Sequence, residues 1–111
     1  MGIMIDAHCE CGFESRMMGA GYGFHSFREG KKEPQEDYWP SYCPKCRTLG
    51  MTDTVPKTRV CEHCGGKVLM YGWKKVSKNE LSFRDDSKST GHLCPQCQKF
   101  TLVFEEIGMW D

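Results

Sequence analysis

The stretch CPKC at residues 43–46, followed after fourteen residues by CEHCGG at residues 61–66, decides the fold of this chain. A Cys-x-x-Cys turn folds back on itself, so both thiolates point to one side and occupy two corners of a tetrahedron. Main-chain N–H groups inside the turn face the first sulfur, and Gly65 suits the left-handed conformation that such a turn needs next. Two of these turns at this spacing predict a four-cysteine metal site.

The eight cysteines of the chain form four close pairs. We call each pair with its turn a knuckle, and number the knuckles in chain order: Cys9/Cys11, Cys43/Cys46, Cys61/Cys64 and Cys94/Cys97. We predict that all eight are metal ligands in two sites, each holding one zinc ion. The alternatives are a disulfide framework and a redox dithiol. Residues 1–6 contain no basic segment or apolar stretch typical of a signal peptide. We therefore expect a cytoplasmic protein, where a reducing environment keeps thiols available for metal.

The length of 111 residues and the 39% hydrophobic content predict a single compact unit with a thin core. Metal can stabilise such a chain, because a structural zinc contributes on the order of 10 kcal/mol to folding. That value is similar to the net stability of a typical domain, roughly 5–15 kcal/mol. No run approaches the ~20 apolar residues of a membrane span, so no membrane association is expected.

The formal charge is zero but unevenly distributed: residues 43–78 carry +6, while residues 1–42 and 79–111 carry −3 each. Eight thiolates with two divalent metal ions would make the loaded protein acidic. A nucleic-acid-binding protein usually has a clearly basic face. The overall balance therefore argues against that class.

Alternating apolar and polar residues predict short strands at each knuckle. We expect strands over 3–8, 13–17, 49–55, 57–60, 67–73 and 100–106. Residues 19–24 are expected to form a turn, and residues 28–37 and 74–92 polar loops, with one helical turn across 78–83. Trp110, next to the end of the chain, is expected to dock on the core. The expected fold class is thus a small all-β protein that is cross-linked by metal ions, with four knuckles on β-hairpins.

The knuckles can pair in three ways. In the nested pairing, the second knuckle joins the third, and the first joins the fourth. The sequential pairing joins first with second and third with fourth, and the interleaved pairing resembles the cross-brace of RING domains. We prefer the nested pairing, because residues 47–60 fit one strand–turn–strand unit. It gives a central ribbon over 43–72, with end hairpins 3–18 and 90–106 brought together.

These knuckles resemble the zinc-ribbon class, in which Cys-Pro-x-Cys and Cys-x-x-Cys-Gly-Gly precede β-strands. The resemblance is best over residues 43–72. It implies fold and metal but no single function, because zinc ribbons serve many roles. A more distant similarity to rubredoxins implies iron as the alternative metal, although Gln98 stands where rubredoxins have glycine.

Four-thiolate sites leave no open metal position, and no catalytic constellation accompanies them, so we expect no enzyme activity. His8, His63 and His92 are expected to face solvent or to lie beside the metal ligands without binding the metal. The first functional hypothesis is a zinc-binding interaction module for another protein, with these candidate contacts: Tyr38, Trp39, Tyr71 and Trp73. The alternatives are an iron electron carrier and a nucleic-acid-binding protein using the basic segment Lys57–Lys78, with these candidate residues: Lys57, Arg59, Lys67, Lys74, Lys75 and Lys78.

Overall fold

The computed structural model describes residues 2–22, 33, 36–56, 58–72, 76–81 and 88–110. Over these residues the chain forms one antiparallel β-sheet and no helix. Its strands are β1 (Gly2–Cys9), β2 (Glu14–Gly21), β3 (Tyr38–Cys43), β4 (Thr48–Asp53), β5 (Leu69–Met70), β6 (Lys88–His92) and β7 (Leu102–Trp110). The strand order is β4-β3-β2-β1-β7-β6, and β5 pairs with β3 outside this path. The expected small all-β fold is therefore confirmed. No helix in the described residues is long and apolar enough to cross a membrane.

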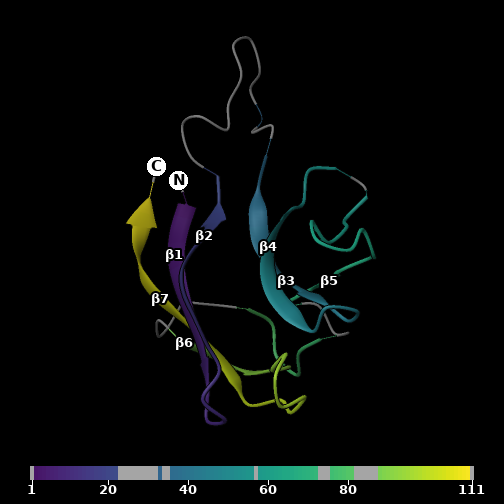
Figure 1. Cartoon of the computed structure of the whole chain (residues 1–111). Helices are drawn as coiled ribbons and strands as arrows, with labels where there is room; N and C mark the ends of the chain where they lie inside the picture. Colours follow the sequence, from purple (N-terminus) through teal and green to yellow (C-terminus); the bar gives the residue numbers. More distant parts are fainter. Residues whose placement is uncertain are drawn as a thin grey trace.

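Strand β1 lies between β2 and β7, so the two ends of the chain come together (Figure 1). The pairing of β1 with β7 runs from Gly2 opposite Trp110 to Cys9 opposite Leu102. Such long-range pairing aligns the first knuckle, at the end of β1, with the fourth knuckle, which precedes β7. The topology of the sheet thus places two distant cysteine pairs side by side.

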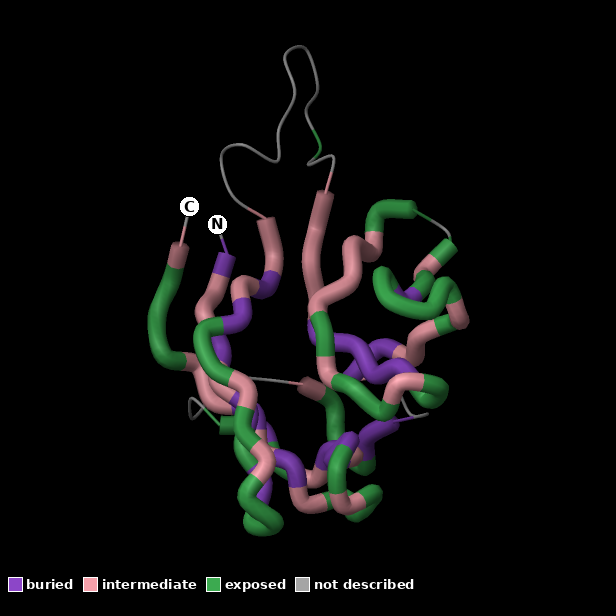
Figure 2. Tube along the Cα trace, viewed as in Figure 1, coloured by how far each residue is buried: buried purple, intermediate pink, exposed green. Residues whose placement is uncertain are grey.

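The core joins side chains of β1, β2 and β7 to side chains of β3 and of the segment after β5, and Figure 2 shows the buried positions in purple. Alternation along β1 turns Ile5, Ala7 and Cys9 inward, and β7 contributes Leu102 and Phe104. Tyr71, which follows β5, is fully buried. Its ring packs edge-on against the ring of Phe104, with 5.0 Å between the two ring centroids. The core therefore joins the β1–β7 pair to the region that carries the second and third knuckles.

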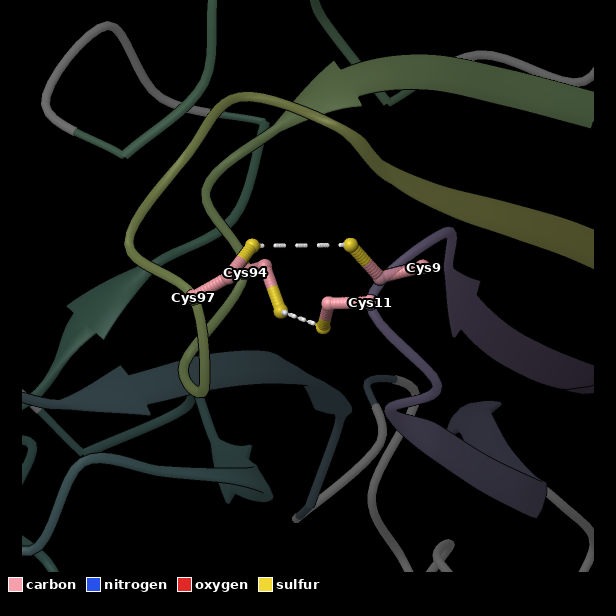
Figure 3. A group of neighbouring side chains, drawn as sticks. All are labelled: Cys9, Cys11, Cys94 and Cys97. Carbon is pink, nitrogen blue, oxygen red and sulfur yellow. Dashed lines mark hydrogen bonds between the residues drawn. The ribbon is translucent and has the colours of Figure 1, made fainter.

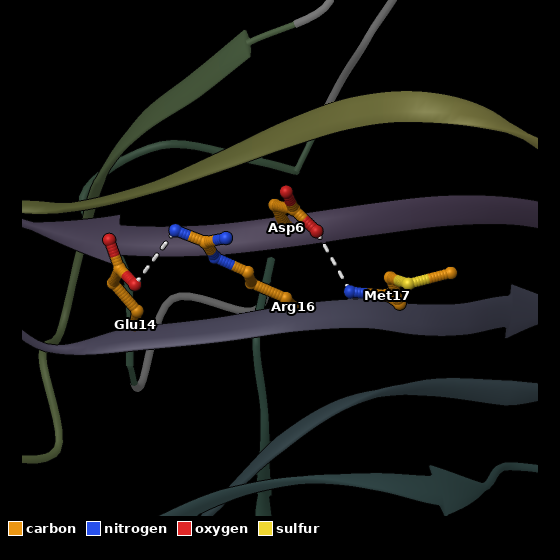
Figure 4. Close-up of polar contacts among 4 residues, drawn as sticks. All are labelled: Asp6, Glu14, Arg16 and Met17. Atoms are coloured by element: carbon orange, nitrogen blue, oxygen red, sulfur yellow. Dashed lines mark hydrogen bonds and ion pairs between the residues drawn. The ribbon is translucent and has the colours of Figure 1, made fainter.

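A β-bulge in β2 sets the direction of its side chains (Figure 4). The register with β1 shifts between Ile5 and Ala7, and Met17 has a positive φ of 55°. The N–H of Met17 donates to Asp6 Oδ1 at 2.8 Å, which satisfies the group that the bulge removes from the ladder. As a result Met18 enters the core while Met17 points to solvent.

Trp110 docks on the first hairpin, across β1 and β2. Its Nε1 donates to the carbonyl oxygens of Ile3 and Ala20, both at 3.1 Å. A Cβ on Gly2 would lie 2.2 Å from the indole ring, so the ring takes the space that a side chain would fill. This contact fastens the C-terminal end of β7 to the first hairpin.

Two strand expectations around the central knuckles are wrong. β4 pairs with β3, over six residue pairs from Tyr38–Asp53 to Cys43–Thr48, instead of with residues 57–60. Residues 58–60 offer three positions at most, and their one bridge joins Val60 to Lys67. The predicted strand 67–73 shrinks to β5 because Gly72, at φ 86°, turns the chain after Tyr71 enters the core. Residues 57 and 73 lie outside the described part.

The other departures are smaller. Residues 19–21 continue β2 instead of forming a turn. The predicted helical turn does not form over its described residues, 78–81, because Ser77 pairs with His92 and Lys78 N donates to Gly91 O. The segment predicted as a polar loop over 74–92 contains β6, and the last strand extends to Trp110. Most of the predicted loop 28–37 lies outside the described residues.

Candidate metal centres

The eight cysteines gather into two groups of four, and the grouping is the nested one. Site 1 contains Cys9, Cys11, Cys94 and Cys97, and site 2 contains Cys43, Cys46, Cys61 and Cys64. Within each group all four Sγ atoms lie within 4.8 Å of one another. Figure 3 shows the site 1 side chains converging from the ends of β1 and the turn before β7. The sequential and interleaved pairings do not occur.

The sulfur spacing fits a tetrahedral metal. Four sulfurs at the usual Zn–S bond length stand about 3.8 Å apart along the edges of the tetrahedron. In site 1, Cys9 Sγ lies 3.6 Å from Cys97 Sγ, and Cys11 Sγ lies 3.7 Å from Cys94 Sγ. The corresponding distances in site 2 are 3.5 Å and 3.9 Å. All eight cysteines are free thiols, so each group could hold one metal ion.

Each knuckle closes with a main-chain hydrogen bond of the same kind, although the turn of the first knuckle is one residue shorter than the other three. The residue after the second cysteine donates its N–H to the carbonyl of the first cysteine, at 2.7–3.0 Å, in all four knuckles. That residue has a positive φ every time: Gly12 (100°), Arg47 (53°), Gly65 (71°) and Gln98 (60°). Glycine adopts this conformation without strain, whereas Arg47 and Gln98 must be held in it.

Gln98 has side-chain contacts that hold it. Its Nε2 donates to Pro95 O at 2.6 Å, and the hydroxyl of Tyr42 donates to its Oε1 at 3.2 Å. The amide side chain therefore supports the turn that glycine supports elsewhere. The absence of glycine at this position does not prevent the fourth knuckle from forming.

Hydrogen bonds to the sulfurs distinguish the two sites. In site 1, the hydroxyl of Thr101 lies 3.0 Å from Cys9 Sγ and 3.7 Å from Cys97 Sγ. In site 2, the described contacts to sulfur from outside the cysteine side chains come from main-chain N–H groups, among them Cys46 N to Cys43 Sγ at 3.5 Å and Gly66 N to Cys64 Sγ at 3.4 Å. Thr101 follows the fourth knuckle in an ordinary polar position, and no sequence motif marks it as a sulfur contact.

The same environment prepares some thiols for metal binding. The main-chain N–H of Lys99 lowers the pKa of Cys97 to about 6, with Thr101 acting in the same direction. The N–H of Cys46 lowers the pKa of Cys43 to about 7. Burial raises the pKa of Cys94 to about 12, so a metal must displace its proton. Each site thus combines a thiol that ionises easily with thiols that lose their proton only when a metal ion binds.

The two sites also differ in their surroundings. Cys94 is fully buried and belongs to the hydrophobic core with Leu102 and Phe104. Site 2 lies at the C-terminal end of β3. One half of this site is the third knuckle, which belongs to a segment with little regular structure. Within that segment the main-chain bonds are local, such as Cys61 N to Gly66 O and Val68 N to Arg59 O. Site 1 is therefore part of the core, whereas site 2 connects an outer segment to the sheet.

A groove runs beside site 2, between β4 and the third knuckle. It has a volume of about 240 Å³. Ser41 and Thr52, whose hydroxyls lie 2.7 Å apart, form part of its polar lining. Val60 and Val68 supply apolar lining, and Cys43 and Cys61 also border it. The shape of this groove therefore depends on the position that site 2 gives to the third knuckle.

The three histidines that the structure describes are not part of either group of four. His63 is exposed, and His8 Nε2 lies 3.8 Å from Glu105 Oε2 on the surface. His92 is fully buried, and its Nε2 lies 2.8 Å from Ser89 Oγ. Burial lowers the pKa of His92 to about 4, so it is neutral at pH 7.

Four of the six predicted contact residues that the structure describes are engaged within the fold. Tyr71 is fully buried and donates its hydroxyl to Leu93 O at 2.7 Å, so it is not a surface contact. Trp39 Nε1 donates to Tyr71 O, and Tyr38 donates to Glu36. Arg59 is half-buried and donates to Thr54 O. Lys67 and Lys78 are exposed, whereas residues 57 and 73–75 lie outside the described part.

Comparison with known proteins gives no family for this chain. No protein-family model, curated protein or solved structure matches it. The two four-cysteine groups on an all-strand fold remain consistent with a zinc-ribbon-like class.

Proposed function

We propose that this chain is a zinc-binding module whose metal ions are structural and whose surface binds another protein. The observation that carries the proposal is the geometry of the two groups, each with four sulfurs within 4.8 Å. Four thiolates fill a tetrahedron, whereas a catalytic zinc keeps one position open for water or substrate. This donor set supports a structural role for the metal ions and argues against a catalytic one.

Metal content tests the first half of the proposal. Protein purified from its native host should contain about two zinc atoms per chain, one for each four-cysteine site, and should be colourless. A coloured sample with iron would support the electron-carrier alternative instead. Expression in another host does not decide, because four-thiolate sites accept several metals. Thiol ligands also require a reducing compartment, which is why we place the protein in the cytoplasm.

The groove beside site 2 supports the second half. Binding sites are concave, with apolar walls and a few polar groups, and this groove combines Val60 and Val68 with the hydroxyls of Ser41 and Thr52. Because Cys43 and Cys61 border it, the metal would hold its two sides together. The proposed partner surface is therefore built by the metal site.

A pair of matched variants tests this surface. Val60, in the groove, and Val55, outside the groove lining, are 43% and 49% exposed. Val60→Glu should abolish capture of a protein partner from a native-host extract, while Val55→Glu should leave it unchanged. Equal capture by both variants would contradict the proposed surface.

A further inference from the structure

The main path of the sheet ends in two edge strands, β4 and β6, and they differ in how they are protected. Exposed edge strands tend to pair with other chains, so proteins blunt them with lysine, proline, bulges or covering segments. The β6 edge has Lys88 at its start, an irregular register between Ser89 and His92, and a bridge from Ser77 to His92. β4 contains no proline, no lysine and no register shift, and no described strand pairs with its outer side.

The hydrogen bonds of β3 show which β4 groups face outward. Pro40 has no N–H, and its carbonyl accepts from Tyr71 N on the β5 side. Main-chain groups alternate between the two sides of a strand. Ser41 therefore faces β4, where it is paired with Gly50. It follows that the N–H and C=O groups of Leu49 and Met51 point to the outer edge.

The sequence of β4 is complementary to itself about Gly50. When two copies of β4 run antiparallel with Gly50 opposite Gly50, Leu49 of one copy is opposite Met51 of the other. These are the residues whose main-chain groups point outward, so the register matches the hydrogen-bonding pattern. Arg47 belongs to the knuckle turn and adds no pair to the ladder, but in this register it lies at the same end of the contact as Asp53 of the other copy. No like charges face each other.

We propose that β4 is a self-association edge, through which two copies of this chain join their sheets by antiparallel strand addition. The occupant of the edge is a second copy because both the main-chain pattern and the Arg47–Asp53 charges are self-complementary. This inference deepens the proposed interaction function by naming one partner. A six-residue strand makes a small contact, so the association is weak and reversible.

Glycine-to-lysine variants give a matched test. A Cβ at Gly50 or at Gly108, on β7, would meet nothing within 4 Å, so each monomer accommodates a side chain. In the dimer, however, lysine at position 50 would face lysine of the second copy. Sedimentation of the zinc-loaded chain from about 10 µM to about 1 mM should show the mass rising toward that of a dimer. Gly108→Lys should behave as the parent, and Gly50→Lys should remain monomeric.

A charge variant tests the register. Arg47→Asp is compatible with the positive φ at this position, because aspartate tolerates that conformation. It places like charges together at both ends of the contact and should weaken association about tenfold. Added salt should weaken association of the parent and strengthen that of Arg47→Asp.

Two results would overturn the inference: a parent chain that stays monomeric up to about 1 mM, or a Gly50→Lys variant that associates as Gly108→Lys does. Zinc content and melting temperature are measured for every variant, so loss of the fold is recognised directly. A monomeric, zinc-loaded chain that still binds another protein through Val60 would leave the proposed function standing while the self-association edge fails.

Discussion

The hydroxyl of Thr101 offers the sharpest test of site 1. It lies 3.0 Å from Cys9 Sγ, and Thr101 is half-buried immediately before β7. Thr101→Val removes the hydroxyl while keeping the shape of the side chain. A hydrogen bond to a charged group contributes about 1.5–3 kcal/mol, and the partial exposure of this one favours the lower end. A loss of about 1.5 kcal/mol corresponds to roughly tenfold weaker metal binding at site 1.

Competition with a zinc chelator at neutral pH measures this effect. The chelator should remove zinc from both sites of the parent. In Thr101→Val, the ion at site 1 should be released at a chelator concentration about tenfold lower than in the parent. Thr101→Ser keeps the hydroxyl and should restore the parent behaviour. Thr48→Val is the matched control, because Thr48 lies beside Cys43 at the start of β4 and its hydroxyl contacts no sulfur among the described residues.

Two outcomes would refute the reasoning about Thr101. The release curve of Thr101→Val could coincide with that of the parent, which would show that the hydroxyl does not support the thiolates. Alternatively, Thr101→Ser could bind zinc as weakly as Thr101→Val, which would show that packing of the side chain, and not its hydrogen bond, matters.

Three further predictions concern stability. Cys94→Ser should lower the melting temperature by about 5 °C more than Cys61→Ser, because Cys94 is fully buried in the core; an equal or reversed order would contradict this. Arg47→Gly should raise the free energy of unfolding in urea by about 1 kcal/mol, since glycine accepts a φ of 53° without strain, and an unchanged midpoint would refute it. Burial lowers the pKa of His92 from 6.5 to about 4, so the folded state favours the neutral ring. The contribution of this neutral ring to stability is therefore complete above pH 6.5 and is lost as the pH falls toward 4. Denaturation of the zinc-loaded protein should show about 1 kcal/mol lost between pH 7.5 and 5.5, and His92→Gln should remove this part of the slope.

Site 2 shows how much of a metal site can be predicted from local sequence. Cys43 and Cys46 lie in one turn, and Cys61 and Cys64 in another, so spacing alone predicts that each pair presents its sulfurs together. The short separation also favours their pairing with each other. What the spacing did not predict is the strand that supports them: β4 pairs with β3, which precedes the second knuckle, because β3 offers six paired residues and the segment after Pro56 does not.

The structure also changes which of the two metal sites is central to the fold. The nested pairing placed the centre of the protein in the ribbon over residues 43–72, with the end hairpins 3–18 and 90–106 brought together. The structure places Cys94 in the core with Leu102 and Phe104, and it places Cys61 on an outer segment. The chain ends are therefore the centre of the fold, because β1 and β7 form its longest pairing.

The sequence by itself determined the strand-rich class, the four knuckles and the eight candidate ligands, because these follow from short-range chemistry: turn geometry, thiol spacing and alternation of apolar residues. Only the tertiary structure decided the position of the Thr101 hydroxyl beside Cys9, the burial of Tyr71 and His92, and the outer side of β4, with which no described strand pairs. Each of these depends on which strands pair across the whole chain. That choice is made by the packing of the complete core, and no local stretch of sequence contains it.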